Sequence, residues 1–488
     1  MRRVALAALT LALAGCMLGP DYRRPEVAVP ESYRYATTGN ADLLTERWWT
    51  QYGDPELDAL VAQAIASNRS LAVAVANVER AAGSLTTTRS AIFPQLGYGA
   101  TSQRSRATER AATPLPPTVP NPQTANQAVA NASWELDLWG KLRRQTESAQ
   151  ADLQATEEER RGVVLTLVAS VVSTYVQLLS LDEQLRISQR TSEVYAESLK
   201  LFELQFKYGV VSQINVAQAR SQFESAQAAI PEIRQQITET ENALSILVGR
   251  NPGPIARDRK LGQLKLPQVP GDLPSNLLQR RPDVLAAEQK LIAANAQIGA
   301  ARALYFPTIS LTGAFGGASA DLSKLFTGPA RVWTYAGSIT GPIFTAGAIS
   351  GQVAQAEAGQ QGALANYEGT VQQSFADVEN ALSARLRLAE QLAAQGRLVA
   401  ALSDYSRLAR LQFTGGYAPY FAVVQAEQQL FPQELRYTTS QAAQLVAVAN
   451  LYKALGGGWI EQAESLAVAP AAAAPAGASA PAAAAARP

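Results

Sequence analysis

Apolar and polar residues alternate in four short stretches of the chain. The alternation is clearest at 130–138, where alanine, tryptophan and leucine take every second place. It is weaker at 96–100 and returns at 309–315 and 333–339. A period of two is typical of a strand with one apolar and one polar face. The sequence therefore predicts four amphipathic strands, with Trp134 on an apolar face and Asp137 on a polar face.

Between these strands the apolar period changes to three and four residues. From Lys141 to about Tyr208 there is no proline, and a second helical segment ends by Gly249. The same plan recurs from 351 to 415 and from 419 to 455. A helix of about 65 residues would extend roughly 100 Å, whereas helices in globular domains average about 11 or 12 residues. The pattern predicts two very long helical hairpins.

Several short segments occur twice in the same order. Arg89–Pro94 is echoed 213 residues later, whereas Leu204–Gly209 and Leu244–Gly249 are echoed 207 residues later. Together with Gln218-Ala219, these matches indicate a tandem duplication of roughly 200 residues with a small deletion. Each unit opens with a helical segment, which in the first unit runs from Asp54-Pro55 towards Ser90. Two strands and a long helical hairpin follow.

The predicted organisation has six parts. They are a signal peptide at 1–15, a lipidated extended segment at 16–54, a first repeat at 55–250, a linker or equatorial segment at 251–274, a second repeat at 275–459 and an Ala/Pro-rich disordered tail at 460–488.

The N-terminus carries an export signal. Arg2 and Arg3 precede a short apolar run, which ends in small residues directly before Cys16, the only cysteine. This arrangement indicates a secretory signal peptide, and the small residues before the cysteine resemble a bacterial lipobox. We expect Cys16 to be lipidated and to become the mature N-terminus. An ordinary signal peptide that happens to contain a cysteine is the alternative.

Composition removes several functional classes. The chain has no histidine, one cysteine and a net charge of +1, so the commonest general base and metal ligand are missing and no intramolecular disulfide can form. The charge gives no reason to expect nucleic acid. No P-loop, HExxH, CxxC or nucleophile-elbow motif occurs. We therefore expect neither an enzyme nor a cofactor, apart from the lipid on Cys16.

Membrane insertion must then use the strands. No segment reaches about 18 to 20 consecutive apolar residues, and lipid does not tolerate open strand edges. Three copies of a four-stranded chain would supply twelve strands, an even number suited to an outer membrane barrel. The predicted fold is mostly α with a membrane β-barrel: a homotrimer whose 12-stranded β-barrel continues into a long α-helical barrel.

The chain resembles a known family at several motifs taken together. The lipobox and the duplicated plan are joined by Gly19-Pro20-Asp21-Tyr22, Trp48-Trp49 and Arg280–Val284. These resemble the TolC-like outer membrane factor family, and most of all its lipoprotein branch of OprM- and NodT-type efflux channels. The resemblance implies an outer membrane duct that passively conducts small molecules from an inner-membrane pump and a periplasmic adaptor. Met17, in place of an aspartate after the cysteine, fits outer membrane placement.

The resemblance also suggests functional residues at the hairpin tips. One tip would run from 206 to 218 and the other from 413 to 425, with Gly209 and Gly416 as turn glycines. The expected adaptor contacts are these two glycines together with Val210, Val211 and Tyr417.

A periplasmic gate is expected on the last helix. Phe421 matches the apolar residue of the constriction, and Gln425 stands where relatives often carry aspartate. Glu427 lies two residues on and is the remaining acidic candidate. The alternative is that Phe421 packs between helices while Glu427 is a solvated surface residue.

Two other functions stay open at this point. One is the exit duct of a type I protein secretion system, and the other is a structural periplasmic coiled-coil lipoprotein. The alternating strands with their tryptophans disfavour a bare coiled coil. Scarce methionine and absent histidine disfavour a specialised copper exporter.

Overall fold

The structure is a computed structural model that describes residues 17–35, 47–108, 110, 116, 118–268 and 274–457. The predicted signal peptide, Cys16 and the predicted tail at 460–488 lie outside the described residues.

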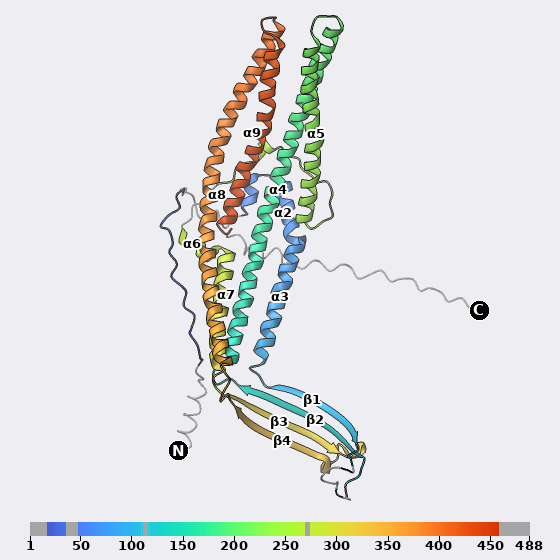
Figure 1. The fold of residues 1–488 in the computed structure, drawn as a ribbon, viewed down its shortest axis with the longest axis vertical. Helices are drawn as coiled ribbons and strands as arrows, with labels where there is room; N and C mark the ends of the chain where they lie inside the picture. Colours follow the sequence, from blue (N-terminus) through green and yellow to red (C-terminus); the bar gives the residue numbers. More distant parts are fainter. Residues whose placement is uncertain are drawn as a thin grey trace, which may run out of the picture. The chain divides into compact units, whose positions relative to one another are not determined.

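The described chain is mostly helical and carries one four-stranded sheet (Figure 1). The helices are α2 (Pro55–Ser67), α3 (Arg69–Ser90), α4 (Lys141–Lys207), α5 (Gln213–Leu247), α6 (Pro274–Arg280), α7 (Pro282–Ala303), α8 (Ala348–Thr414) and α9 (Tyr420–Ala454). The strands are β1 (Gln95–Ser105), β2 (Gln123–Leu136), β3 (Thr308–Ser319) and β4 (Arg331–Thr340). Neighbouring strands pair antiparallel in the order β1-β2-β3-β4.

The duplication is visible in the helix lengths. Both α4 and α8 have 67 residues, and both α5 and α9 have 35. The shorter helices that precede the strands, α3 and α7, each have 22 residues. Each repeat therefore builds a helix, a strand pair and a long helical hairpin in the same order, as the sequence repeats predicted.

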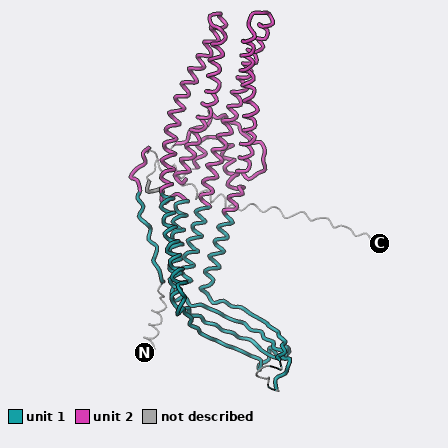
Figure 2. Tube along the Cα trace, in the orientation of Figure 1, with its two compact units in different colours: residues 1–28, 75–159, 283–371 teal, residues 29–74, 160–282, 372–488 magenta. Residues whose placement is uncertain are grey.

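Two compact units divide the chain, and each contains segments from both repeats (Figure 2). The first unit comprises 1–28, 75–159 and 283–371, and it includes the sheet. The second comprises 29–74, 160–282 and 372–488, and it includes the turns that join α4 to α5 and α8 to α9.

The second unit has an aromatic core. Trp48 stacks on Tyr452 with ring centroids 5.0 Å apart, and the Tyr52 hydroxyl donates to the Leu445 carbonyl at 2.9 Å. Tyr175 of α4 donates to the Asp54 carboxylate at 2.8 Å. Burial and this carboxylate together raise the pKa of Tyr175. Asp54 also accepts from the Glu56 amide at 3.0 Å and so caps the start of α2.

Two helical stretches are long and apolar enough to cross a membrane by composition alone. They lie in Pro55–Ser90 and in Lys141–Lys207, where 39% and 61% of the apolar window is buried inside the protein. In α4, Val168, Val172 and Leu179 are buried members of the core of the second unit. The apolar character of α4 is therefore accounted for by core packing.

The N-terminal segment binds to the first unit in an extended form. The buried guanidinium of Arg144 donates to the Leu18 carbonyl at 3.1 Å and to Asp21 at 2.8 Å. Gly19 has φ of 95°, and a Cβ there would lie 2.4 Å from the Gly299 Cα. Only glycine fits this close approach. The segment that begins one residue after Cys16 is thus held by α4 and α7.

Two local expectations were wrong. The helical segment that starts at Pro55 is interrupted, because Asn68 has an extended backbone and accepts from the Leu71 amide at 3.0 Å. Asp137 does not belong to a strand, since β2 ends at Leu136. Its carboxylate accepts from the amide of Arg143 at 2.9 Å and so satisfies a free donor at the start of α4.

Candidate channel surfaces

The strand register collects the apolar side chains on one face of the sheet. Tyr98 is opposite Ala130, Ala130 is opposite Phe315, and Phe315 is opposite Trp333. Because side chains on directly paired residues share a face, this cross-strand row fixes the orientation of every strand. The apolar face consists of Leu96, Tyr98, Ala100, Ala128, Ala130, Ala132, Trp134, Leu136, Ile309, Leu311, Phe315, Trp333, Tyr335 and Ile339.

The opposite face is mainly polar and small. It carries Gln95, Thr101, Gln127, Asn131, Ser133, Glu135, Thr312, Thr334 and Ser338. Ser310 and Ser338 share a hydrogen bond of 2.7 Å across β3 and β4. Apolar side chains directed to one side and polar side chains to the other suit a strand between lipid and a water-filled lumen. The predicted period of two is confirmed over all four strands.

The two hairpin tips share one turn geometry. Gly209 has φ of 73°, and its amide donates to the Phe206 carbonyl at 2.9 Å, while the Val210 amide donates to Gln205 at 2.9 Å. In the second repeat, Gly416 has φ of 78°, and the Gly416 and Tyr417 amides make the corresponding bonds at 3.0 Å and 2.8 Å. This pattern ends a helix on a left-handed glycine. The role of turn glycine predicted for both residues is confirmed by these positive φ angles.

Large apolar side chains are exposed around these turns. In the first tip they are Leu204, Phe206, Tyr208, Val210 and Ile214, and in the second tip Leu408, Leu411, Tyr417 and Phe421. Val211, a predicted contact residue, is instead half-buried against Phe202 and its neighbours in the tip core. Several large apolar side chains exposed around one turn are typical of an interaction site. Sequence reasoning named Val210 and Tyr417 but not Tyr208, Ile214 or Leu411, although all lie at the turns it located.

The predicted gate residues occupy two different environments. Phe421 is 60% exposed, and Gln425 is also exposed one helical turn further along the same face of α9. Tyr420, beside them, is buried, with its ring centroid 4.0 Å from that of Phe202. Phe421 therefore does not pack between helices of its own chain.

Glu427 is buried within the chain. Its residue exposure is 4%, and its carboxylate pairs with Arg410 of α8. Burial raises the pKa of Glu427, while the Arg410 charge lowers it. A neighbouring cavity of about 130 Å³ is lined by Tyr195, Leu430 and Phe431 among others. Glu427 is thus an internal link between α8 and α9. No local pattern indicated Arg410 as its partner, since the two residues lie on different helices.

A second ion pair joins α4 to α9 near the same cavity. Arg190 donates to both carboxylate oxygens of Glu434, at 2.7 and 2.8 Å. The two links connect the last helix to both long helices of the unit. Neither was predicted, because charged residues on helices are usually solvated.

The architecture is that of a membrane channel component, and comparison with known proteins identifies its class. The family model for outer membrane efflux proteins matches residues 60–250 and again residues 273–457. The chain belongs to the outer membrane efflux protein family, and it is an outer membrane protein that acts in efflux.

Individual relatives resemble the chain over nearly its whole length. The toluene efflux pump outer membrane protein TtgC of Pseudomonas putida is 34% identical over 466 residues, which are 94% of this chain and 96% of TtgC. The cation efflux system protein CusC of Escherichia coli is 34% identical over 457 residues, covering 92% and 97%. The open-state MtrE outer membrane channel of Neisseria gonorrhoeae superposes with a TM-score of 0.82, at 31% identity, covering 91% and 99%.

These findings confirm the family, the fold class, the efflux function and the outer membrane location expected from the sequence. They also show that family members are channel proteins.

Proposed function

We propose that three copies of this chain form a passive duct through which an inner-membrane pump, joined by a periplasmic adaptor, expels small toxic molecules. One observation carries the proposal: at the mouth, Phe421 and Gln425 lie exposed on a single face of α9. Three Phe421 side chains facing a common axis form an apolar ring that closes by bulk and by excluding water. Gln425 adds hydrogen bonding to this ring but no charge.

The sheet supplies the membrane part of the duct. Within the described chain β1 and β4 are the outer strands of the sheet order, and lipid does not tolerate their unpaired edges. Pairing β1 of one copy with β4 of the next removes these edges, and three copies close a ring of twelve strands. The apolar face then meets lipid and the polar face lines the lumen.

The exposed apolar turns are the adaptor-docking surface. Gly209, Val210, Gly416 and Tyr417 form its centre, while Val211 supports it from inside the tip. The cargo is set by the pump. Relatives named for toluene efflux and for cation efflux are equally similar to this chain, at 34% identity. Sequence identity to these relatives therefore does not indicate which substrate is exported.

A lipid on Cys16 would anchor the same assembly. The segment that follows Cys16 in the sequence is held by Arg144, which donates to the Leu18 carbonyl and to Asp21. The variant Cys16→Ala should incorporate no radiolabelled palmitate. It should still reach the membrane, because the strands insert independently of the acyl chain. Label retained by Cys16→Ala would refute this anchor.

The gate is tested by conductance. Phe421→Ala should raise single-channel conductance in planar bilayers and sensitise cells to large antibiotics such as vancomycin. Ile214 occupies the equivalent position of the first repeat and is also exposed, so Ile214→Ala tests whether α9 alone forms the constriction. If it does, Ile214→Ala should conduct like wild type. Unchanged conductance in Phe421→Ala would place the constriction elsewhere.

The membrane face is tested within one strand. Leu311 lies on the apolar face and Thr312 on the polar face of β3. An arginine in lipid near the midplane costs about 2 to 4 kcal/mol, so Leu311→Arg should lower the yield of heat-resistant trimer far more than Thr312→Arg. Equal yields would contradict the assigned orientation.

A further inference from the structure

The connection between β3 and β4 folds back over the apolar face of the sheet. A side chain at position 317 would point to that face, because Gly317 pairs with Ala128 of β2 and with Arg331 of β4. A Cβ on Gly317 would lie 2.1 Å from the Leu325 carbonyl oxygen. The loop backbone therefore contacts the sheet at this glycine, and Leu325 of the loop is buried.

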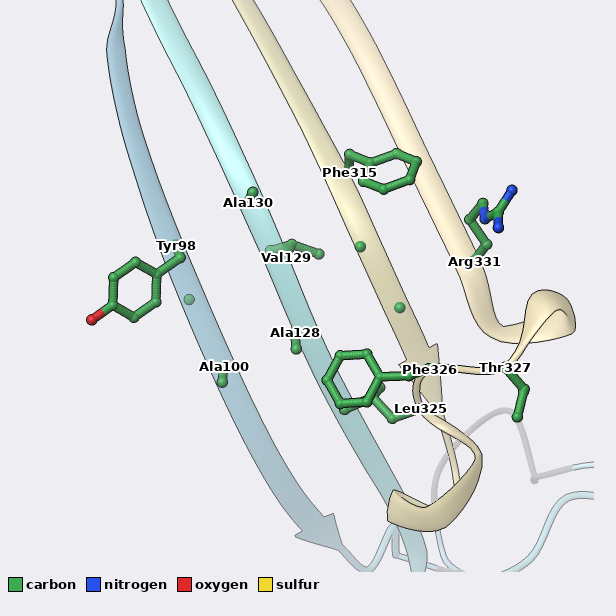
Figure 3. A pocket seen from close by; sticks show the side chains of 13 residues that line it. Tyr98, Ala100, Ala128, Val129, Ala130, Phe315, Leu325, Phe326, Thr327 and Arg331 are labelled. Atoms are coloured by element: carbon green, nitrogen blue, oxygen red, sulfur yellow. The ribbon is translucent and has the colours of Figure 1, made fainter.

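This folded loop creates a groove on the lipid-facing side. It has a volume of about 460 Å³. Figure 3 shows Leu325 and Phe326 lying across the face of β2, with Phe315 on β3 and Arg331 on β4. Most of the lining is apolar, and Phe326 is 86% exposed although it lies against a membrane-facing surface.

The groove lies where the apolar face of the sheet ends. The next cross-strand row beyond Ala128 is polar: Ser102 donates to the Asn126 side chain at 2.7 Å, and Asn126 donates to the Ala320 carbonyl at 3.0 Å. At the other end of β2, the Trp134 indole donates to the Ile92 carbonyl at 2.8 Å. Asn126 and Trp134 are eight positions apart on β2. This is about 26 Å of strand, which at a tilt of about 40° spans roughly 20 Å of the apolar band of about 25 Å in such barrels. The polar row therefore lies near the edge of this band, within a few ångströms of the headgroups.

Charge selects among the lipids that could enter this groove. Arg331 lines it and has no ion-pair partner among the residues that the structure describes, whereas Lys324 on the same loop pairs with Asp321 at 2.8 Å. A guanidinium one cross-strand row from the polar row, beside an apolar groove, is complementary to a phosphate on an acyl lipid. The helices connect at the opposite end of the strands, which assigns this rim to the outer leaflet of the membrane.

We propose that this groove binds a phosphorylated acyl lipid of the outer leaflet. Arg331 contacts the phosphate, and the acyl chain lies against Phe326, Phe315 and Ala130. The site belongs to the membrane surface of the channel and is separate from its conducting path. It would fix the β3–β4 loop in place at the outer rim.

Native mass spectrometry of the delipidated, full-length assembled protein tests this site. The probes are bisphosphorylated lipid A and the same lipid after removal of both phosphates. Wild type should bind the phosphorylated form at least about tenfold more tightly, as one charge-assisted contact of about 1.4 kcal/mol would give. Arg331→Gln should abolish that preference. Arg80→Gln, which changes an exposed arginine of α3, should retain it.

A second variant separates the apolar part of the site from the charged part. Phe326→Ser should weaken binding of both forms of the lipid by a similar factor, while heat-resistant assembly stays intact because Phe326 is exposed. Equal affinity of wild type for the two lipids would overturn the proposal, and so would unaltered phosphate preference in Arg331→Gln.

Discussion

The two hairpin tips have the same backbone turn, but the ion pair in each tip has its charges in exchanged positions. Shifting the first tip by 207 residues aligns Glu203 with Arg410 and Arg220 with Glu427. Each tip thus has one ion pair between its two helices, with the signs exchanged. In the first tip both side chains are exposed, Arg220 by 59% and Glu203 by 46%. In the second, Arg410 is 42% exposed but Glu427 only 5%.

The difference shows which features the two copies have kept since the duplication and which have diverged. A link between the helices at this level is present in both copies, whereas its polarity and depth have diverged. Burial makes the second link fragile, because a carboxylate out of water depends on its partner, while an exposed pair contributes little. The fragile link lies six residues beyond Phe421 on α9, the helix with the proposed gate.

The largest effect is expected from removing the partner of the buried carboxylate. Arg410→Gln leaves Glu427 charged and unpaired, which costs about 3 kcal/mol where both partners are buried and less here, because Arg410 is 42% exposed. Hydrogen exchange of the α9 amides around 423–427 should accelerate accordingly. Arg410→Gln combined with Glu427→Gln removes the charge as well and should recover most of the protection. A double variant no better protected than Arg410→Gln would show that the buried charge is not the cause.

An intermediate effect is expected from pH. Burial raises the pKa of Glu427 and Arg410 opposes that rise, so Arg410→Gln should raise it further. When a folded-state pKa exceeds the unfolded value of about 4.3, the folded form binds the proton more tightly and gains stability as pH falls. Protection factors of Arg410→Gln, corrected for intrinsic exchange, should approach those of wild type as pH falls through the folded-state pKa. The recovery should be complete below the unfolded value. A gap independent of pH would remove Glu427 from the explanation.

The smallest effect is expected in the first tip. Arg220→Gln breaks a pair that water already screens, and exposed pairs contribute about 0.2 to 1 kcal/mol. Exchange of the α5 amides near 220 should therefore change by less than about fivefold. An effect as large as that of Arg410→Gln would mean that exposure does not distinguish the two tips.

Sequence reasoning located the regular elements well because their signals are local. The proline-free stretch from Lys141 predicted α4 to within a residue or two of its end at Lys207, and the alternation predicted all four strands. Asp137 was misplaced because it continues the alternation of β2 while its carboxylate caps the next helix. Local pattern cannot separate these two roles.

The candidate site was predictable only in part, since its partners are remote in sequence. The turn glycines and Phe421 were named from the family resemblance, and the structure adds that Phe421 is exposed. The pairing of Glu427 with Arg410 requires knowing which faces of α8 and α9 meet, and a glutamate is rarely buried. The groove beneath Phe326 depends on a loop folding back at Gly317, for which a lone glycine in a strand is an ambiguous signal.

The equal lengths of α4 and α8 restrict how this protein can change in size. Each residue of a helix adds about 1.5 Å and turns the chain by about 100°. Inserting one residue into α4 would therefore rotate everything beyond it, turning buried positions towards water along the rest of its 67 residues. Seven residues nearly restore the original facing. Viable length variants of this duct should therefore differ by whole heptads, which are close to two helical turns, with matched changes in α4 and α8. The length of these helices would then change in steps of about 10 Å.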